Sequence, residues 1–119
     1  QAVNEGLIRV TPDGASLTAQ GQIFSLMTCH MGNRLCLASP EAVISEDKAG
    51  ARVATVVNAS YQGKKRVDLS ACGRCTQAVL YTSKSVLPPS VFEQEDVLAQ
   101  IQDGSIEIPP HSVLFLRFA

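Results

Sequence analysis

The stretch Arg52-Val53-Ala54-Thr55-Val56-Val57-Asn58 decides the fold class of this 119-residue chain. It is rich in β-branched residues, which pack well on a pleated sheet, and nearly every position is apolar. A short apolar run of this kind is typical of a strand that is buried inside a sheet. We therefore predict a central β-strand over residues 52–58.

The segments on both sides of this stretch also have β character. Residues 66–69 alternate so that Val67 and Leu69 face inward, and residues 111–118 close the chain as an apolar strand. Asp103-Gly104 is a strong hairpin signal, and apolar and polar residues alternate after it. Further short strands are expected at 6–10, 34–38, 42–45 and 75–82, and residues 96–102 fit either a strand or an isolated helical turn. About eight short strands separated by turns predict a mainly β fold, an antiparallel β-sandwich.

One segment near the N-terminus has helical periodicity instead. Residues 18–31 carry an apolar stripe with a 3.6-residue period, with Thr18 as a capping residue and Gly32 as a C-terminal stop. If the chain is part of a larger protein, this stripe should stay exposed and form an interface. The predicted interface residues are Ile23, Phe24, Met27 and Met31.

Size and charge limit the class of protein. The length fits a single domain over residues 1–119, with the helix at about 18–31 preceding a sandwich at about 34–118. The net charge of -1 argues against a nucleic-acid partner, which normally requires a basic face. Because no apolar run approaches about 18 residues, we expect no membrane span.

Four cysteines form a candidate metal site. Cys72-Gly73-Arg74-Cys75 has the C-x2-C spacing that supplies two zinc ligands, whereas Cys29 and Cys36 are separated by six residues, which is not a common zinc spacing. Two other interpretations stay open: disulfide pairing in an oxidising compartment, or free thiols that pack as small hydrophobic residues. If the site binds a metal, its ligands are predicted to be Cys29, Cys36, Cys72 and Cys75 and its ion zinc; otherwise we expect no cofactor.

Several motifs occur in an order that resembles a known family. They are Thr11-Pro12-Asp13-Gly14 with Leu17-Thr18, Ile23-Phe24, His30 with Gly32, Val56-Val57-Asn58, residues 91–97 and Ile108-Pro109-Pro110-His111-Ser112-Val113-Leu114. Together they resemble the C-terminal β-sandwich region of α-L-arabinofuranosidase-type retaining glycoside hydrolases, over roughly residues 6–118. The resemblance implies a β-sandwich that follows the last helix of a catalytic barrel.

The resemblance also implies that this chain is not catalytic by itself. In such enzymes the two catalytic carboxylates lie on barrel strands upstream of the matched region, and retaining hydrolysis needs them about 5 Å apart. No motif in this chain pairs two of its carboxylates, and we assign no catalytic residue. Glu93, Glu95 and Asp96 form a small acidic cluster, for which a solvated loop is a simpler interpretation than a site for a cation such as calcium. The carboxylates are Glu5, Asp13, Glu41, Glu46, Asp47, Asp68, Glu93, Glu95, Asp96, Asp103 and Glu107.

Two functions follow as hypotheses. The first is a non-catalytic accessory β-sandwich that packs on and stabilises the catalytic barrel of a glycosidase. The second is a stand-alone binding domain with a cysteine-based zinc or disulfide clamp. An exposed apolar helix stripe favours the first, and cysteines close together in space favour the second.

Overall fold

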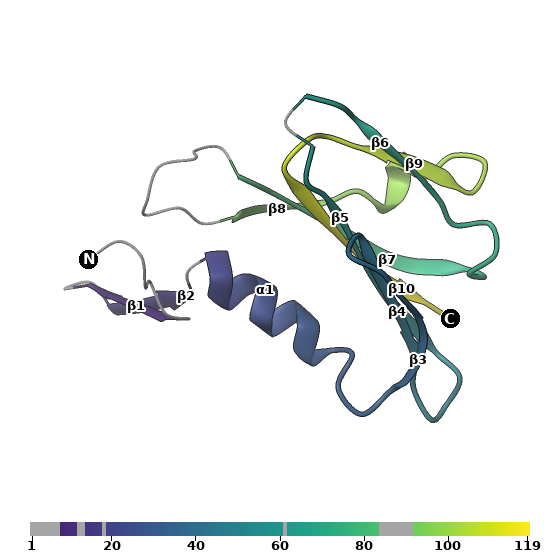
Figure 1. Cartoon of the computed structure of the whole chain (residues 1–119), viewed down its shortest axis with the longest axis horizontal. Coiled ribbons are helices and arrows are strands. Elements are labelled where there is room, and N and C mark those ends of the chain that lie inside the picture. Colours follow the sequence, from purple (N-terminus) through teal and green to yellow (C-terminus); the bar gives the residue numbers. More distant parts are fainter. Residues whose placement is uncertain (1–7, 12–13, 18, 61, 84–91) are drawn as a thin grey trace.

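A computed structural model describes residues 8–11, 14–17, 19–60, 62–83 and 92–119 of the chain (Figure 1). In chain order its elements are β1 (Ile8–Thr11), β2 (Gly14–Leu17), α1 (Ala19–Thr28), β3 (Arg34–Ala38), β4 (Ala42–Glu46), β5 (Arg52–Asn58), β6 (Lys65–Asp68), β7 (Cys75–Ser83), β8 (Phe92–Asp96), a 3-10 turn η1 (Leu98–Gln100), β9 (Ser105–Ile108) and β10 (Ser112–Phe118). The fold is mainly β, as predicted, with one short helix near the N-terminus.

Eight of the described strands form two antiparallel sheets. The larger sheet has six strands in the order β3-β4-β5-β10-β7-β8, and β6 pairs with β9 in a second sheet. β1 and β2 pair separately with each other. The predicted central strand β5 lies inside the large sheet, where it pairs with β4 on one side and β10 on the other. The two layers are arranged as in a sandwich (Figure 1).

The two faces of the large sheet bury different cores. Ala54 and Val56 of β5, with Leu114 and Leu116 of β10, belong to the larger core, which also includes β6 and β9 residues such as Ile108. On the opposite face, Val113 and Phe115 pack with Val53, Tyr81 and Leu26 of α1 in a smaller core. Side chains that alternate along a strand point to opposite faces, so β5 and β10 contribute to both cores.

The helix is shorter than predicted. α1 ends at Thr28, and the amides of Cys29, His30 and Met31 each bond a carbonyl three residues back, at 3.0–3.1 Å. These tighter turns end the α-helix three residues before the predicted boundary at residue 31. Gly32 follows with φ +80°, the left-handed conformation expected of a residue that stops a helix. Thr18, the predicted cap, lies outside the described residues.

Of the two structures that residues 96–102 fit, the strand is wrong and the helical turn is confirmed, as η1 over Leu98–Gln100. The apolar alternation of this segment buries Val97 and packs Ile101 against the larger core from a 3-10 turn. Asp96 starts this turn by accepting a bond from the Leu98 amide at 3.0 Å. The edge strand β8 lies just before it, over residues 92–96. The predicted Asp103-Gly104 turn is confirmed: both residues have positive φ, 53° and 74°, which a two-residue hairpin turn requires.

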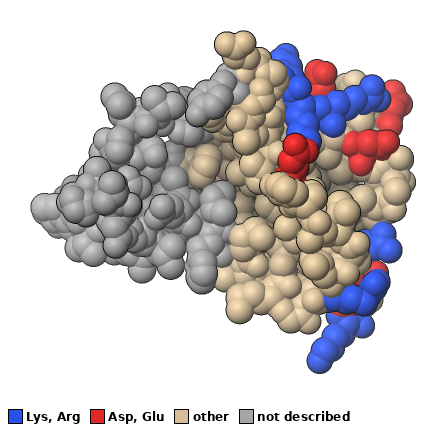
Figure 2. Space-filling model, viewed as in Figure 1, with Lys and Arg blue, Asp and Glu red and all other residues tan. Residues whose placement is uncertain are grey.

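Charged side chains of both signs lie close together on the surface. Figure 2 shows Lys and Arg beside Asp and Glu at one end of the molecule, with an uncharged area between two such groups. Glu46 pairs with Arg34 at 2.6 Å and Arg52 at 3.3 Å, and Glu41 pairs with Lys65 at 2.8 Å. These exposed pairs each contribute little to stability.

Candidate interaction surface

The predicted helix stripe is only partly described by the structure. Leu26, which the stripe did not include, is the helix residue buried against the sheet. Met27 is half-buried, and Met31, in the turn after the helix, has 73% of its surface exposed. The side chains of Ile23 and Phe24 lie outside the described residues. One predicted interface residue is therefore strongly exposed, and the prediction for Ile23 and Phe24 stays open.

Exposed apolar residues also occur on β3, which the predicted interface did not include. β3 is an edge strand, and all five of its residues are exposed. Leu35 and Leu37 are 59% and 47% exposed, so with Met31 they make up three of the four large exposed hydrophobic residues that are described. We call Met31, Leu35 and Leu37 the β3 surface. Leu35 pairs with Ser45 and Leu37 with Ile44 across a register shift, so the two leucines flank the sheet edge from opposite faces. Their apolar character is visible in the sequence, but an edge strand cannot be distinguished from a central one without the long-range pairing.

The opposite edge of the six-stranded sheet, β8, carries charges that protect it from pairing with another chain. β8 carries Glu93, Glu95 and Asp96, all exposed. The Gln22 side chain of α1 bonds the start of this strand twice, accepting from the Phe92 amide at 2.7 Å and donating to its carbonyl at 3.0 Å. Charges on an edge strand discourage association with another chain. Of the two edges of the six-stranded sheet, the β3 edge is the one whose described residues combine exposure with an apolar surface.

A polar cluster fixes the end of α1 to the sheet beside the β3 surface. His30 Nδ1 lies 2.7 Å from Ser45 Oγ of β4, and Nε2 lies 2.8 Å from Thr55 Oγ1 of β5. Asn33 Nδ2 donates to Ser45 Oγ at 3.1 Å and to the Cys29 carbonyl at 3.3 Å. Ser45 and Thr55 are buried, and burial lowers the pKa of His30. The cluster determines where the chain leaves the helix and begins β3.

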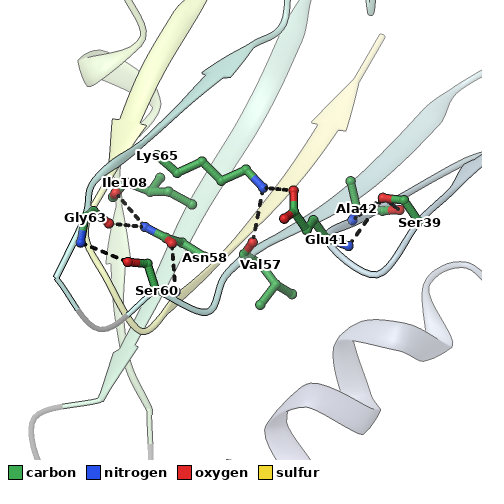
Figure 3. Close-up of polar contacts among 9 residues, drawn as sticks. All are labelled: Ser39, Glu41, Ala42, Val57, Asn58, Ser60, Gly63, Lys65 and Ile108. Carbon is green, nitrogen blue, oxygen red and sulfur yellow. Dashed lines mark hydrogen bonds and ion pairs between the residues drawn. The ribbon is translucent and has the colours of Figure 1, made fainter.

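Two motifs of the family resemblance meet at the other end of the sandwich (Figure 3). The buried Asn58 side chain donates through Nδ2 to the carbonyls of Gly63 at 2.9 Å, Pro109 at 3.0 Å and Ile108 at 3.3 Å. Its Oδ1 accepts from the Ser60 amide at 3.1 Å. Because these contacts use both the donor and acceptor groups of the amide, Asn58 has a structural role. A cavity of about 360 Å³ beside it is lined by Glu41, Lys65 and residues of the same loop.

The four cysteines do not come together. Cys29 packs against the smaller core, Cys72 and Cys75 pack against the larger core on the other face of the sheet, and Cys36 is exposed on β3. Burial raises the pKa values of the Cys72 and Cys75 thiols. In the part of the chain that is described, no three His, Cys, Asp or Glu residues group as metal ligands. The structure thus gives no support to the predicted four-cysteine zinc site.

Three of the described carboxylates have partners that stabilise their charged form. The Lys65 hydrogen bond lowers the pKa of Glu41, the Arg34 hydrogen bond lowers that of Glu46, and the Ser70 backbone amide lowers that of Asp68. A catalytic general acid needs the opposite, a carboxyl pKa raised toward neutrality. These three groups therefore serve as acceptors in ion pairs and turns.

Comparisons with known proteins support the fold. No model of a protein family matches the chain, and no curated protein matches it. Among solved structures, the chain is similar to an arabinofuranosidase crystal structure, with a TM-score of 0.58 and 17% identity. The match covers 96% of this chain but only 31% of the arabinofuranosidase chain. This is a distant relationship of fold with part of a glycoside hydrolase. In the described residues, no helix is long and apolar enough to span a membrane.

Proposed function

We propose that this chain is a non-catalytic accessory β-sandwich of a glycoside hydrolase and that it packs on a catalytic barrel through the β3 surface. The observation that carries the proposal is the similarity in fold to 31% of an arabinofuranosidase chain. The remaining two thirds of such a chain is long enough for a separate catalytic part. A domain that supports a barrel needs an apolar docking face and no acid–base pair of its own.

The β3 surface has the chemistry that this partner requires. Met31, Leu35 and Leu37 are exposed within one seven-residue stretch of the chain, and Arg34, the one charged residue of β3, is already paired with Glu46. Apolar residues left exposed on a sheet edge favour contact with another protein surface. A barrel that leaves an apolar patch exposed between its outer helices would fit such an edge.

The first test is activity of the isolated chain. We expect no hydrolysis of aryl arabinosides by the purified chain, because no motif in its sequence pairs two carboxylates as acid and base. Turnover that persists after repeated purification would contradict the non-catalytic role. The natural reading frame gives a parallel test: it should encode a barrel with two catalytic glutamates, and its absence would overturn the proposal.

Docking is tested in the full protein that this reading frame encodes, with sandwich and barrel together. Met31→Lys and Leu35→Lys should expose the boundary between sandwich and barrel to limited proteolysis and lower the melting temperature. Burying one such side chain contributes about 1.5–3 kcal/mol. Leu98→Lys is the matched control, since Leu98 is the fourth exposed large hydrophobic residue and lies on η1. Equal effects at residues 31, 35 and 98 would contradict docking through the β3 surface.

The stand-alone alternative keeps one observation in its favour. Cys72 lies in the connection before β7 and Cys75 is the first residue of β7, and both pack against the larger core. A zinc or disulfide clamp would need further ligands or an oxidant. Metal analysis and thiol titration of the purified chain test it, and four free thiols with no bound metal would rule it out.

A further inference from the structure

His30 joins the end of α1 to the sheet through both of its ring nitrogens. Its partners Ser45 and Thr55 are 1% and 4% exposed and come from neighbouring strands, β4 and β5. We propose that His30, Ser45, Thr55 and Asn33 form a pH-sensitive latch. Neutral His30 holds the end of α1 and the following turn on the sheet, and protonation of His30 loosens that attachment.

The number of hydrogens in the cluster explains why the charge matters. A neutral imidazole has one N–H and one acceptor nitrogen, so it donates to one hydroxyl and accepts from the other. One hydroxyl hydrogen then lacks an acceptor within the cluster, whichever tautomer is present. An imidazolium donates from both nitrogens, and then neither the Ser45 nor the Thr55 hydroxyl has an acceptor there.

Protonation therefore adds one unpaired hydroxyl hydrogen at a buried position. Asn33 in its observed orientation supplies no acceptor, because its Nδ2 donates to Ser45 Oγ at 3.1 Å and to the Cys29 carbonyl at 3.3 Å. Among the described residues, the hydroxyls of Ser45 and Thr55 have no hydrogen bonds outside the cluster. A buried donor without an acceptor destabilises the state that contains it. The protein can relieve this by letting the turn move away from the sheet.

The surrounding charges do not favour the imidazolium. On β10 the same face carries Arg117, a cation whose Nη2 donates to Cys29 Sγ at 3.6 Å, beside His30 in the chain. On β4 and β5 the neighbours on that face are Val43, Val53 and Val57. Glu46 and Arg34 are paired with each other. No described carboxylate bonds to His30, and its pKa is lowered by burial.

The direction of the pH effect follows from these facts. Because the folded pKa of His30 is below the unfolded value of about 6.5, the latch contributes fully above that value. Its contribution is lost as the pH falls through the folded pKa. The end of α1 carries Met31, so acidification would also weaken docking through the β3 surface; this consequence rests on the proposed function, whereas the latch does not.

An NMR titration of the whole chain tests the latch without any partner. We expect the His30 ring to titrate below about 6.5, and amides of residues 26–33 to shift with the same midpoint. Amides in the β5–β10 ladder should not share this transition. A His30 pKa at or above its ordinary value, or a titration that leaves residues 26–33 unchanged, would overturn the proposal.

Variants separate His30 from other titrating groups. His30→Gln can still donate and accept but does not titrate, so the pH dependence of residues 26–33 should disappear. His111→Gln, which removes the second histidine of the chain, should leave it in place. The reverse pattern would assign the transition to His111 and contradict the latch. If His30→Gln fails to fold, the titration of the natural chain still decides.

Discussion

At the residue scale, Asn58 connects two parts of the chain that are far apart in sequence. Its amide bonds three carbonyls and one amide, from the β5–β6 connection and the β9–β10 corner. Next to it, the His111 amide donates to the Ser60 carbonyl at 3.2 Å, and His111 has φ +54°. Hydrogen bonds from Asn58 and to Ser60 thus stabilise the β9–β10 corner, where His111 has its unusual positive φ.

Removing this amide should destabilise the fold strongly. We expect Asn58→Ala to lower the free energy of unfolding by about 2–4 kcal/mol, because buried carbonyls lose their donor. Asn58→Asp should cost more, since a carboxylate would face those carbonyls. Denaturant titration measures both. Ser60→Ala, which removes exposed hydrogen bonds to the same loop, should cost less than either; similar losses for all three variants would contradict the role of Asn58.

The sequence pointed to Asn58 and to the corner at 108–114, but only as separate motifs. Their contact depends on β5 and β10 pairing so that Ser112 lies opposite Asn58. The partners of His30 could not be predicted for the same reason. The sequence placed this residue only near the end of the predicted helix 18–31. Its two hydroxyl partners, Ser45 and Thr55, are 15 and 25 residues away and come from strands whose neighbours no local pattern fixes.

At the element scale, sequence patterns located both the central strand β5 and the edge strand β3, but did not show which of them lies at an edge. β5 and β10 are apolar on both faces, and that property is local. In contrast, Val97, Ala99 and Ile101 alternate as a strand would, yet Asp96 accepts the Leu98 amide and starts a 3-10 turn. β3 also looked like an ordinary apolar strand. Its exposure follows from the absence of a second neighbour in the six-stranded sheet.

The β3 edge should therefore tolerate charge. In the isolated chain, Leu35→Lys and Leu37→Lys should each change the free energy of unfolding by no more than about 0.5 kcal/mol, as surface substitutions usually do. In light scattering, the same variants should stay monomeric up to a higher protein concentration than the natural chain. A loss of several kcal/mol would mean that these leucines belong to a core and would count against the β3 surface as an interface.

At the scale of the whole molecule, the two cores differ in which elements they join. The larger core joins both sheets, whereas the smaller one holds α1 through Leu26. Local opening therefore needs less free energy at α1 than in the β5–β10 ladder. This difference matters for the latch and for docking, since both act at the end of α1 while the sandwich beneath stays folded.

Hydrogen exchange can measure that separation. Leu26→Ala should speed exchange of amides in α1 and leave the β5–β10 ladder protected, because it removes contacts of the smaller core. Leu114→Ala, at a fully buried site of the larger core, should cost about 2–5 kcal/mol and speed exchange in both regions. If Leu26→Ala instead lowered protection in α1 and β10 equally, the helix and the sandwich would unfold as one unit, and a latch that opens at α1 alone could not operate.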